Sequence, residues 1–374
     1  EKAEEIERNN YEKYKDVYEL TSRYLRRLPV LLYGGYAINE LLPAHLKIYQ
    51  EGQLPDIDFF TYKPKDIAKH LVKQFRKQGL DTASFSEALH PGTFKVFVHG
   101  LQVADITGIS KVAYLRLSKN SVFSSTGIRI VDPQYLRMSL HMLMSQAVDS
   151  HRWSKVFKRL IAFYKVYPPK PCKPVALTQS KALPADLVHS IYDKIHDNQY
   201  VLFGARELQL VLNEKTPVVT PHLPSIQILV DADPEVVANT TFLQDLKAWG
   251  LSMKVMKEDD FMPKHVFVMY KQRKVLGIYQ ANACVTYNEI QNTRVASIHT
   301  MLRMYLCMTL SPYLHFKKAA EELECITGSL SYLQQKTNQR KRKVLQEFVV
   351  DCYGSQAGLI TLRREKIMRF RDDS

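Results

Sequence analysis

The sequence has few cysteines, no long apolar run and no excess of acidic charge. Its five cysteines are scattered over 374 residues, with no C-x-x-C pair and no histidine at zinc-finger spacing. This pattern argues against a disulfide scaffold and a structural zinc site, and it favours a reducing compartment. The most apolar stretch, residues 296–314, is interrupted by polar and charged side chains. It is too short and too polar for a bilayer span, so we expect no membrane anchor.

The charge that is present is positive and localised. The chain has 52 Lys and Arg residues against 38 Asp and Glu residues, a formal net charge of +14. Residues 110–181 carry thirteen of the basic residues and two Asp, a net charge of +11, and a second basic block lies within residues 340–371. A localised excess of this kind favours a polyanionic partner such as nucleic acid, with a solubilising surface as the alternative.

Hydrophobic periodicity divides the chain into five segments. Residues 1–28 have the apolar spacing of a helix, and residues 29–167 alternate short strands with helices. Residues 168–184 form a proline-rich linker, residues 185–350 repeat the order of elements, and residues 351–374 form a basic tail. We predict an α/β (α+β) protein with two tandem copies of one unit, each a small mixed sheet flanked by helices. In the second copy, residues 242–251 are expected to form the helix that corresponds to residues 71–80.

The first chemically suggestive feature is the pair Gly34-Gly35. These glycines are expected to form a turn between a strand at residues 30–33 and a helix at residues 36–42. Glycine lets a ligand approach the backbone closely, and the free amides of the following helix favour a phosphate. A purely structural Gly-Gly turn is the alternative.

Three aspartates lie on strands predicted to be neighbours. Asp56 and Asp58 are two residues apart and so share one face of a strand, and Asp105 interrupts an otherwise apolar strand. Adjacent carboxylates repel each other unless they are solvated or share a cation, and oxygen ligands suit Mg²⁺ or Mn²⁺. Three carboxylates beside a turn that can hold a triphosphate predict a two-metal site for nucleotidyl transfer.

This constellation resembles the nucleotidyltransferase fold of the DNA polymerase beta superfamily. Within it, segments 33–39, 55–59 and 151–160 resemble the poly(A) polymerase catalytic subunits of large cytoplasmic DNA viruses of the poxvirus, mimivirus and asfarvirus type. The similarity covers most of the chain. The 20 residues between Gly35 and Asp56 exceed the usual spacing of the superfamily but suit the viral subgroup.

The resemblance implies an enzyme that adds AMP from ATP to RNA 3′ ends, using two Mg²⁺ or Mn²⁺ ions held by Asp56, Asp58 and Asp105. It implies a viral protein of the host cytoplasm or virion, and it admits a homodimer or a processivity subunit as partner. The predicted nucleotide contacts are Tyr33, Gly34, Gly35, Asn39, Lys155 and Arg159. Lys155 and Arg159 share a helix face at i and i+4. The predicted RNA contacts are Arg152, Lys158 and Lys165.

The internal repeat places catalysis in the first copy. Aligned by element order, Asp56, Asp58, Asp105 and Gly35 correspond to Ser225, Gln227, Gly277 and Ala205. The second copy therefore lacks all three carboxylates and is expected to be a degenerate, RNA-holding domain.

Two other functions stay open on the residues alone. One is a nucleotidyltransferase of the same fold that modifies another acceptor, against which the +11 segment argues. The other is a non-catalytic RNA-binding or processivity subunit, against which the intact acids of the first copy argue.

Overall fold

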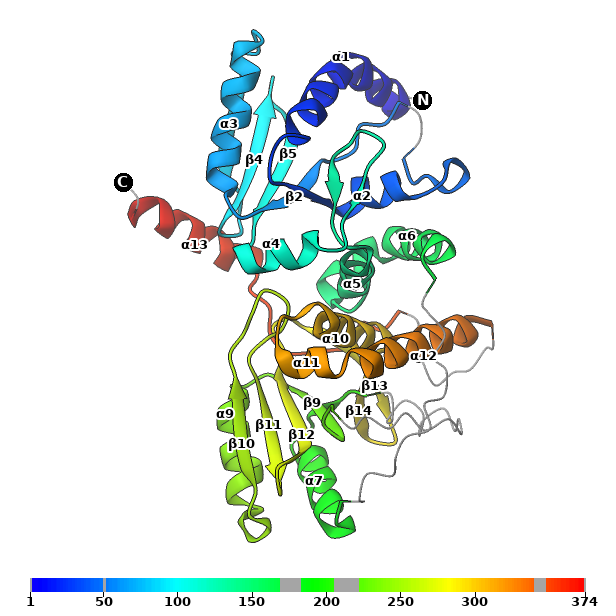
Figure 1. Cartoon of the computed structure of the whole chain (residues 1–374), viewed down its shortest axis with the longest axis vertical. Helices are drawn as coiled ribbons and strands as arrows, with labels where there is room; N and C mark the ends of the chain where they lie inside the picture. The colour runs from blue at the N-terminus through cyan, green and yellow to red at the C-terminus, as the bar shows by residue number, and fades with distance from the viewer. Residues whose placement is uncertain (1, 50–51, 169–182, 205–221, 340–347, 373–374) are drawn as a thin grey trace. The chain divides into compact units, whose positions relative to one another are not determined.

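The computed structural model describes residues 2–49, 52–168, 183–204, 222–339 and 348–372 (Figure 1). Contacts within it divide the chain into two units. The first unit comprises residues 1–136, 161–167 and 357–374, and the second comprises residues 137–160 and 168–356. Each unit contains one mixed sheet with helices, which confirms the predicted fold class. Most of the predicted linker, residues 169–182, lies outside the described residues.

The first unit contains a seven-stranded sheet of order β3-β4-β5-β2-β1-β7-β6. Its strands are β1 (Leu31–Tyr33), β2 (Asp58–Thr61), β3 (Ser84–Glu87), β4 (Thr93–Val98), β5 (Leu101–Gly108), β6 (Val122–Phe123) and β7 (Arg129–Ile130). Its helices are α1 (Lys2–Leu25), α2 (Gly34–Leu41), η1 (Ala44–Leu46), α3 (Pro64–Lys77) and α4 (Lys111–Ser118). Three helical segments follow β7, namely α5 (Pro133–Met144), η2 (Ala147–Arg152) and α6 (Trp153–Val166).

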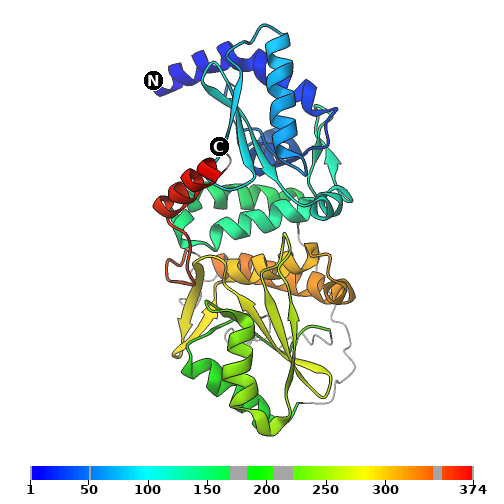
Figure 2. The same cartoon turned by 90° about the vertical axis from the view of Figure 1, so that its left-hand side faces the viewer.

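Apolar spacing explains why these segments fold as they do. In α3, Pro64 occupies the first turn, where its missing N–H costs nothing, and Ile67, Leu71 and Phe75 form a buried stripe. This helix lies alongside β4 and β5 (Figure 2). In β1, Leu31 and Leu32 are fully buried. The expected turn at Gly34-Gly35 is wrong in one respect, because both glycines already belong to α2.

The second unit contains an eight-stranded sheet of order β10-β11-β12-β9-β8-β14-β13-β15. Its strands are β8 (Val201–Leu202), β9 (Ile226–Val230), β10 (Ser252–Met256), β11 (His265–Tyr270), β12 (Arg273–Gln280), β13 (Val285–Ile290), β14 (Thr293–Ala296) and β15 (Cys352–Tyr353). Its helices are α7 (Ala185–Asp197), α9 (Pro234–Val237), η3 (Ala238–Gln244), η4 (Lys247–Trp249), α10 (Ile298–Leu310), α11 (Leu314–Lys318) and α12 (Ala320–Gln339). The apolar faces of α7 and η3 pack on Ile228, Val266 and Ile278 of the sheet.

The two sheets repeat each other strand by strand. The pairs β1·β2 and β8·β9 are antiparallel, whereas β2·β5 and β9·β12 are parallel. The pairs β4·β5 and β11·β12 are antiparallel, and each contains a register shift, after Val96 and after Val268 respectively. The outer pairs agree as well, since β1·β7 and β8·β14 are parallel. The loose internal repeat in the sequence is therefore a repeat of topology.

The helix expected at residues 242–251 is displaced in the structure. It begins at Pro234, where the side chain of Asp233 accepts a hydrogen bond from the amide of Glu235, and continues as a π-helical turn through Gln244. Proline in the first turn and an aspartate cap are ordinary helix-start signals. The sequence prediction placed the start too late because it followed the apolar residues alone.

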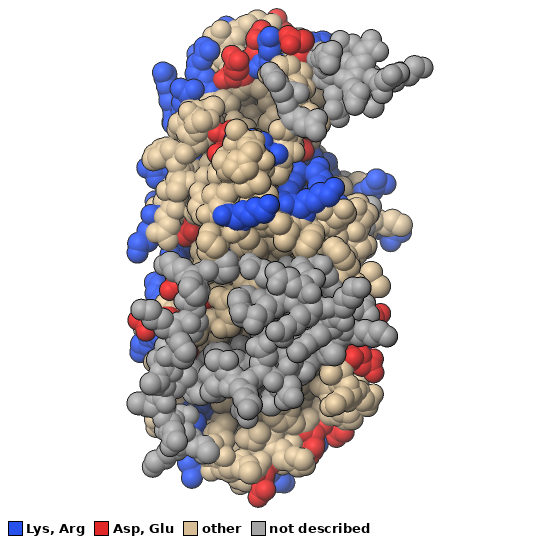
Figure 3. Space-filling model, turned by 90° about the vertical axis from the view of Figure 1, so that its right-hand side faces the viewer, with Lys and Arg blue, Asp and Glu red and all other residues tan. Residues whose placement is uncertain are grey.

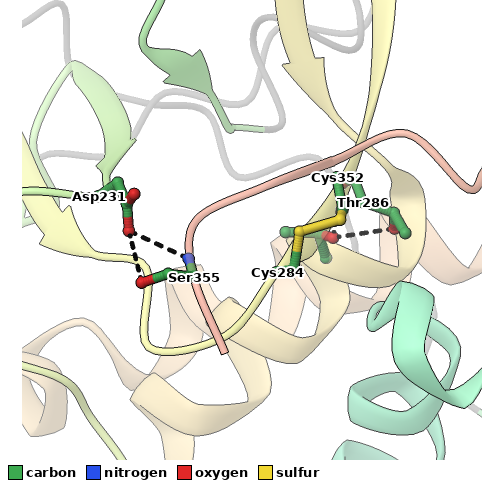
Figure 4. Close-up of a disulfide and its surroundings, with 6 residues drawn as sticks. Asp231, Cys284, Thr286, Cys352 and Ser355 are labelled. Carbon is green, nitrogen blue, oxygen red and sulfur yellow. Dashed lines mark hydrogen bonds between the residues drawn. A yellow bond between two sulfur atoms is a disulfide. The ribbon is translucent and has the colours of Figure 1, made fainter. Parts of the chain in front are cut away.

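The cysteines correct a second expectation. Cys284 and Cys352, 68 residues apart, form a disulfide between the start of β13 and β15, the strand that the first sheet lacks (Figure 4). The side chain of Asp231 accepts hydrogen bonds from the amide and hydroxyl of Ser355 close by. Cys325 is disulfide-bonded as well. The prediction of a chain without disulfides is wrong, and the inference of a reducing compartment loses its basis.

The end of the chain, predicted as a basic tail, contains β15 and then α13 (Leu359–Asp372). The side chain of Lys366 donates a hydrogen bond to the carbonyl of Glu87 at 2.6 Å, and that of Arg369 donates to the carbonyl of Leu89 at 3.0 Å. These bonds hold α13 to the end of β3 and to the segment that follows it. None of the helices in the described part of the chain is long and apolar enough to cross a membrane.

Candidate active site

The start of α2 lies directly against Asp58. Tyr33 ends β1 in an extended conformation, and Gly34 then adopts a φ of +73°. A Cβ atom at Gly34 would lie 2.6 Å from Oδ2 of Asp58, closer than such contacts allow. Only glycine satisfies both the backbone conformation and this approach. The side chain of the N-cap residue Tyr33 makes no capping hydrogen bond at the start of α2, and the N-terminus of a helix favours an anion.

Strand pairing brings Asp58 and Asp105 side by side. The two residues are direct partners in the parallel pair β2·β5, so their side chains leave the sheet on one face. Ile57 and Phe59 alternate with Asp58 and are buried, as the sequence predicted. Tyr33 is the partner of Asp58 on β1, and Lys95 is the partner of Asp105 on β4. These four side chains form what we call the first row: Tyr33, Asp58, Asp105 and Lys95.

The pKa of Tyr33 in this row is affected by the charges of its neighbours. The ring of Tyr33 stacks on Phe60 with 3.9 Å between ring centres, and its hydroxyl lies 2.9 Å from that of Thr107. Burial raises the pKa of Tyr33, and the negative charges of Asp58 and Asp105 raise that pKa further. Tyr33 is therefore a neutral group beside two carboxylates.

Asp56 differs from the other two acids. It precedes β2 and is exposed to solvent. Burial raises the pKa of Tyr18 on α1 to about 12, and the charge of Asp56 contributes to that shift. No group of three or more His, Cys, Asp and Glu side chains is arranged to hold a metal ion within the described residues. The structure thus pairs Asp58 with Asp105 without gathering all three acids as ligands.

Lys95 is a member of the row that sequence reasoning missed. Its Nζ lies 3.3 Å from Oδ2 of Asp105 and donates a hydrogen bond to Oε1 of Gln102 at 2.7 Å. The available signal was the alternation in β4, where Lys95 stands between the apolar residues Phe94 and Val96. The pairing with Asp105 could not be read from the sequence, because the register shift near Val96 determines it.

The chemistry of this pair suits a bound cation. The side chain of Asp105 is 19% exposed, and its Oδ1 is buried with no hydrogen-bond partner among the described residues. A buried carboxylate oxygen without a partner is costly, and a divalent cation is a natural partner for it. Asp58 lies one strand away on the same face. Both acids therefore fit the oxygen ligation that Mg²⁺ or Mn²⁺ requires.

The other predicted contacts are distributed differently. The side-chain oxygen of Asn39 accepts hydrogen bonds from the amides of Ile48 and Tyr49, so Asn39 fixes the segment after η1. On α6, Lys155, Lys158 and Lys165 are exposed and Arg159 is partly buried, and Arg152 just before the helix is exposed. On the face drawn in Figure 3, one group of Lys and Arg side chains lies above mid-height and others are scattered toward the edges. Because Lys155 and Arg159 belong to the second unit, their contact with a triphosphate stays a prediction.

The second unit fills the matching positions with uncharged side chains. Gln227 is the partner of Gly277 in β9·β12, and Gly277 is the partner of Phe267 in β11·β12. Phe203 follows β8, and its amide donates a hydrogen bond to the carbonyl of Gln227. We call Phe203, Gln227, Gly277 and Phe267 the second row.

The second row is closed by packing. A Cβ atom at Gly277 would lie 2.8 Å from Cε2 of Tyr279 and 2.9 Å from Cγ of Pro224, and Tyr279 is fully buried. The side-chain amide of Gln227 donates a hydrogen bond to the hydroxyl of Tyr305 at 2.8 Å. An aromatic ring therefore fills the space beside the glycine that stands where the first unit has Asp105.

One family model matches part of this chain. Residues 19–150 match the family model described as poly(A) polymerase catalytic subunit. That range contains Gly34 and all three acids and ends before Lys155 and Arg159.

Two curated viral proteins, both named as poly(A) polymerase catalytic subunits, are similar to part of the chain. The one from Acanthamoeba polyphaga mimivirus is 25% identical over 171 residues, which cover 44% of this chain and 29% of that protein. The one from African swine fever virus (strain Badajoz 1971 Vero-adapted) is 27% identical over 180 residues, which cover 44% of this chain and 36% of that protein. The matched part is thus about a third of each relative's length.

A solved structure extends the likeness of fold to both units. The crystal structure of the Megavirus polyadenylate synthase matches 97% of this chain and 78% of that chain, with a TM-score of 0.75 and 20% sequence identity. At this identity the match shows a shared fold.

Proposed function

We propose that this chain, which resembles the poly(A) polymerase catalytic subunits of large cytoplasmic DNA viruses through residues 19–150, is a template-independent polynucleotide adenylyltransferase. The observation that carries the proposal is the in-register pair Asp58 and Asp105, with Gly34 and the start of α2 in contact with Asp58. Carboxylates on adjacent strands beside a helix N-terminus can hold a nucleoside triphosphate together with its metal ions.

The residues would divide the work as follows. The first amides of α2 bind phosphate oxygens of ATP, and Gly34 keeps this approach open. Asp58 and Asp105, with Asp56 at the exposed edge, hold two Mg²⁺ or Mn²⁺ ions. Bound divalent ions neutralise phosphate charge and lower the pKa of an attacking hydroxyl. The 3′-oxygen of RNA forms a bond to the α-phosphorus of ATP, the bond from that phosphorus to pyrophosphate breaks, and the hydroxyl proton leaves to solvent.

The second unit is proposed to hold RNA without catalysing transfer. Its row has lost every carboxylate, and the space is filled by Tyr279. The selection of adenine, the viral origin, the action in host cytoplasm or virion, and the predicted RNA contacts on α6 rest on the resemblance. A processivity subunit or a second copy of the chain is proposed as partner on the same ground.

The test is an extension assay with a labelled oligoribonucleotide, Mg²⁺ or Mn²⁺, and each nucleoside triphosphate in turn. We expect extension with ATP and little with the other three. Asp58→Asn should abolish extension while RNA affinity is retained, and the matched control Asp81→Asn, at an exposed turn of the same unit, should remain active.

Each alternative predicts a different result in this assay. Tight RNA binding with no extension by any nucleotide favours the non-catalytic binding subunit. Nucleotide transfer to a small hydroxyl acceptor but not to RNA favours the other nucleotidyltransferase. Full activity of Asp58→Asn would overturn the assignment of the site.

A further inference from the structure

The first row contains one cationic side chain, Lys95. It lies next to Asp105, which is one of the proposed metal ligands. Lys95 Nζ lies between Oδ2 of Asp105, at 3.3 Å, and Oε1 of Gln102, at 2.7 Å. All three residues belong to the hairpin of β4 and β5, so the sheet itself sets their spacing. Oδ1, the other oxygen of the same carboxylate, is buried without a hydrogen-bond partner in the described part of the chain.

The two oxygens of Asp105 are thus in different states. Oδ2 faces an ammonium group, whereas Oδ1 is buried and has no hydrogen-bond partner among the described residues. An ammonium group beside a carboxylate lowers the local negative charge that attracts a dication. The side chain of Lys95 is only 35% exposed, so solvent screens this effect incompletely.

The second unit supports a link between the two groups. Phe267 stands at the position of Lys95, and Gly277 stands at the position of Asp105. The register shift that aligns the partners is present in both hairpins, so the backbone alone does not require the charges. Neither the cation nor the carboxylate is present at these two positions of the second row, although Lys274 Nζ on β12 lies 4.9 Å from the centre of the Phe267 ring.

We propose that Lys95 is a positioning residue that holds Oδ2 of Asp105 and leaves Oδ1 as the single oxygen for a metal ion. Lys95 thereby makes the binding of that ion depend on the bound triphosphate. This inference rests on the proposed function. Without nucleotide, the charge of Lys95 opposes a dication at Asp105. With ATP bound, the negative triphosphate outweighs one ammonium group, and the ion binds together with its nucleotide.

The experiment measures Mn²⁺ binding directly, from the electron paramagnetic resonance signal of free Mn²⁺, with and without a non-hydrolysable ATP analogue. The proteins are the full chain and its variants Lys95→Met, Lys95→Arg and Asp105→Asn. Lys73→Met, an exposed lysine on α3, is the matched control for the loss of one positive charge from the same unit.

We expect Lys95→Met to bind Mn²⁺ about tenfold more tightly than the unmodified chain when nucleotide is absent, because a cation next to the ion is gone. The gain in affinity that the ATP analogue produces should shrink in this variant. Lys95→Arg keeps the charge and should behave like the unmodified chain, and Lys73→Met should not change the binding.

Two failures can be told apart. If Mn²⁺ binding is lost in Asp105→Asn but is unchanged or weaker in Lys95→Met, the role of Lys95 is wrong and the proposed metal site stands. If Asp105→Asn binds Mn²⁺ as the unmodified chain does, with and without the analogue, Asp105 is not a ligand and the proposed function loses its site. RNA extension by Lys95→Met is a separate measurement. We expect the extension rate of this variant to depend on the Mg²⁺ concentration differently from that of the unmodified chain.

Discussion

The two units use one sheet topology for two different rows of side chains. Asp58 and Asp105 of the first row occupy the same register positions as Gln227 and Gly277 of the second row. The second sheet forms with no carboxylate in the row, so the acids are not needed to build the sheet. Two carboxylates on adjacent strands repel each other unless a cation lies close to them, which supports the proposal that these acids serve a ligand.

The difference also extends to how each row is covered. The first row keeps an open approach, because Gly34 has no side chain where it meets Asp58. The second row is packed, because Tyr279 and Pro224 fill the space beside Gly277. The first row is open to a ligand and the second is packed. Substitutions in the first row should therefore lower mainly the reaction rate, and substitutions in the second should lower mainly the stability.

The largest contrast is expected from the acids themselves. Asp105→Asn should lower the rate of RNA extension by about 10³-fold, because a metal ligand contributes several kcal/mol to the transition state. Gln227→Leu, at the position of Asp58 in the second row, should cost about 1 kcal/mol of unfolding free energy through its lost bond to Tyr305 and leave the rate nearly unchanged. Single-turnover kinetics and urea unfolding measure the two effects. Equal losses of rate in both variants would contradict the proposal that only the first unit carries the catalytic site.

The next contrast concerns β15, which the first sheet lacks. The disulfide from Cys284 to Cys352 closes a loop of 68 residues, so replacing both cysteines by serine should lower the unfolding free energy of the second unit by about 4 kcal/mol. Both tryptophans, Trp153 and Trp249, lie in that unit, so their fluorescence follows its unfolding selectively. An unchanged urea midpoint would show that β15 is held by its strand pairing without the disulfide.

A smaller effect is expected at Gly34. Gly34→Ala should lower the extension rate by roughly 100-fold, because its Cβ would displace Asp58 by contact at 2.6 Å. Gly79→Ala is the matched control, with a similar φ of +80° and nothing within 4 Å of the added Cβ among the described residues. Both variants bear similar backbone strain and should lower the unfolding temperature, with a further loss in Gly34→Ala from the contact with Asp58, but only Gly34→Ala should lose rate. Similar rates in the two would mean that the approach to Asp58 is unimportant.

The part of the site that could be predicted depended on local pattern. The alternation around Asp58 determined which side chains leave the sheet on one face, and Gly34 was identified by its place between a strand and a helix. The correspondence of Asp105 with Gly277 followed from element order, and the strand registers give the same pairing.

The rest depended on contacts that local pattern does not contain. A hairpin without the register shift would set Lys95 opposite Ala104, so its pairing with Asp105 required the bulge to be known. The disulfide required Cys284 and Cys352 to meet across two strands that are far apart in sequence. The start of α9 was misplaced because a cap and a proline set it rather than an apolar stripe.

The smallest expected effect tests whether the second row is as closed as its packing indicates. Gly277→Ala places a methyl group 2.8 Å from Cε2 of Tyr279 and 2.9 Å from Cγ of Pro224, and overpacking of this kind costs about 1–3 kcal/mol. Tryptophan fluorescence during urea unfolding should show this loss, and RNA extension should not change.

A second substitution decides the cause of that loss. Adding Tyr279→Leu to Gly277→Ala removes the ring that the new methyl group meets, so the double variant should lose less stability than the sum of the two single variants. Strict additivity would place the strain elsewhere and leave the space beside Gly277 open to a larger side chain. Coupling between the two would mean that restoring an acid at Gly277 is not enough to rebuild a metal site, because the ring of Tyr279 must leave before any carboxylate can enter the row.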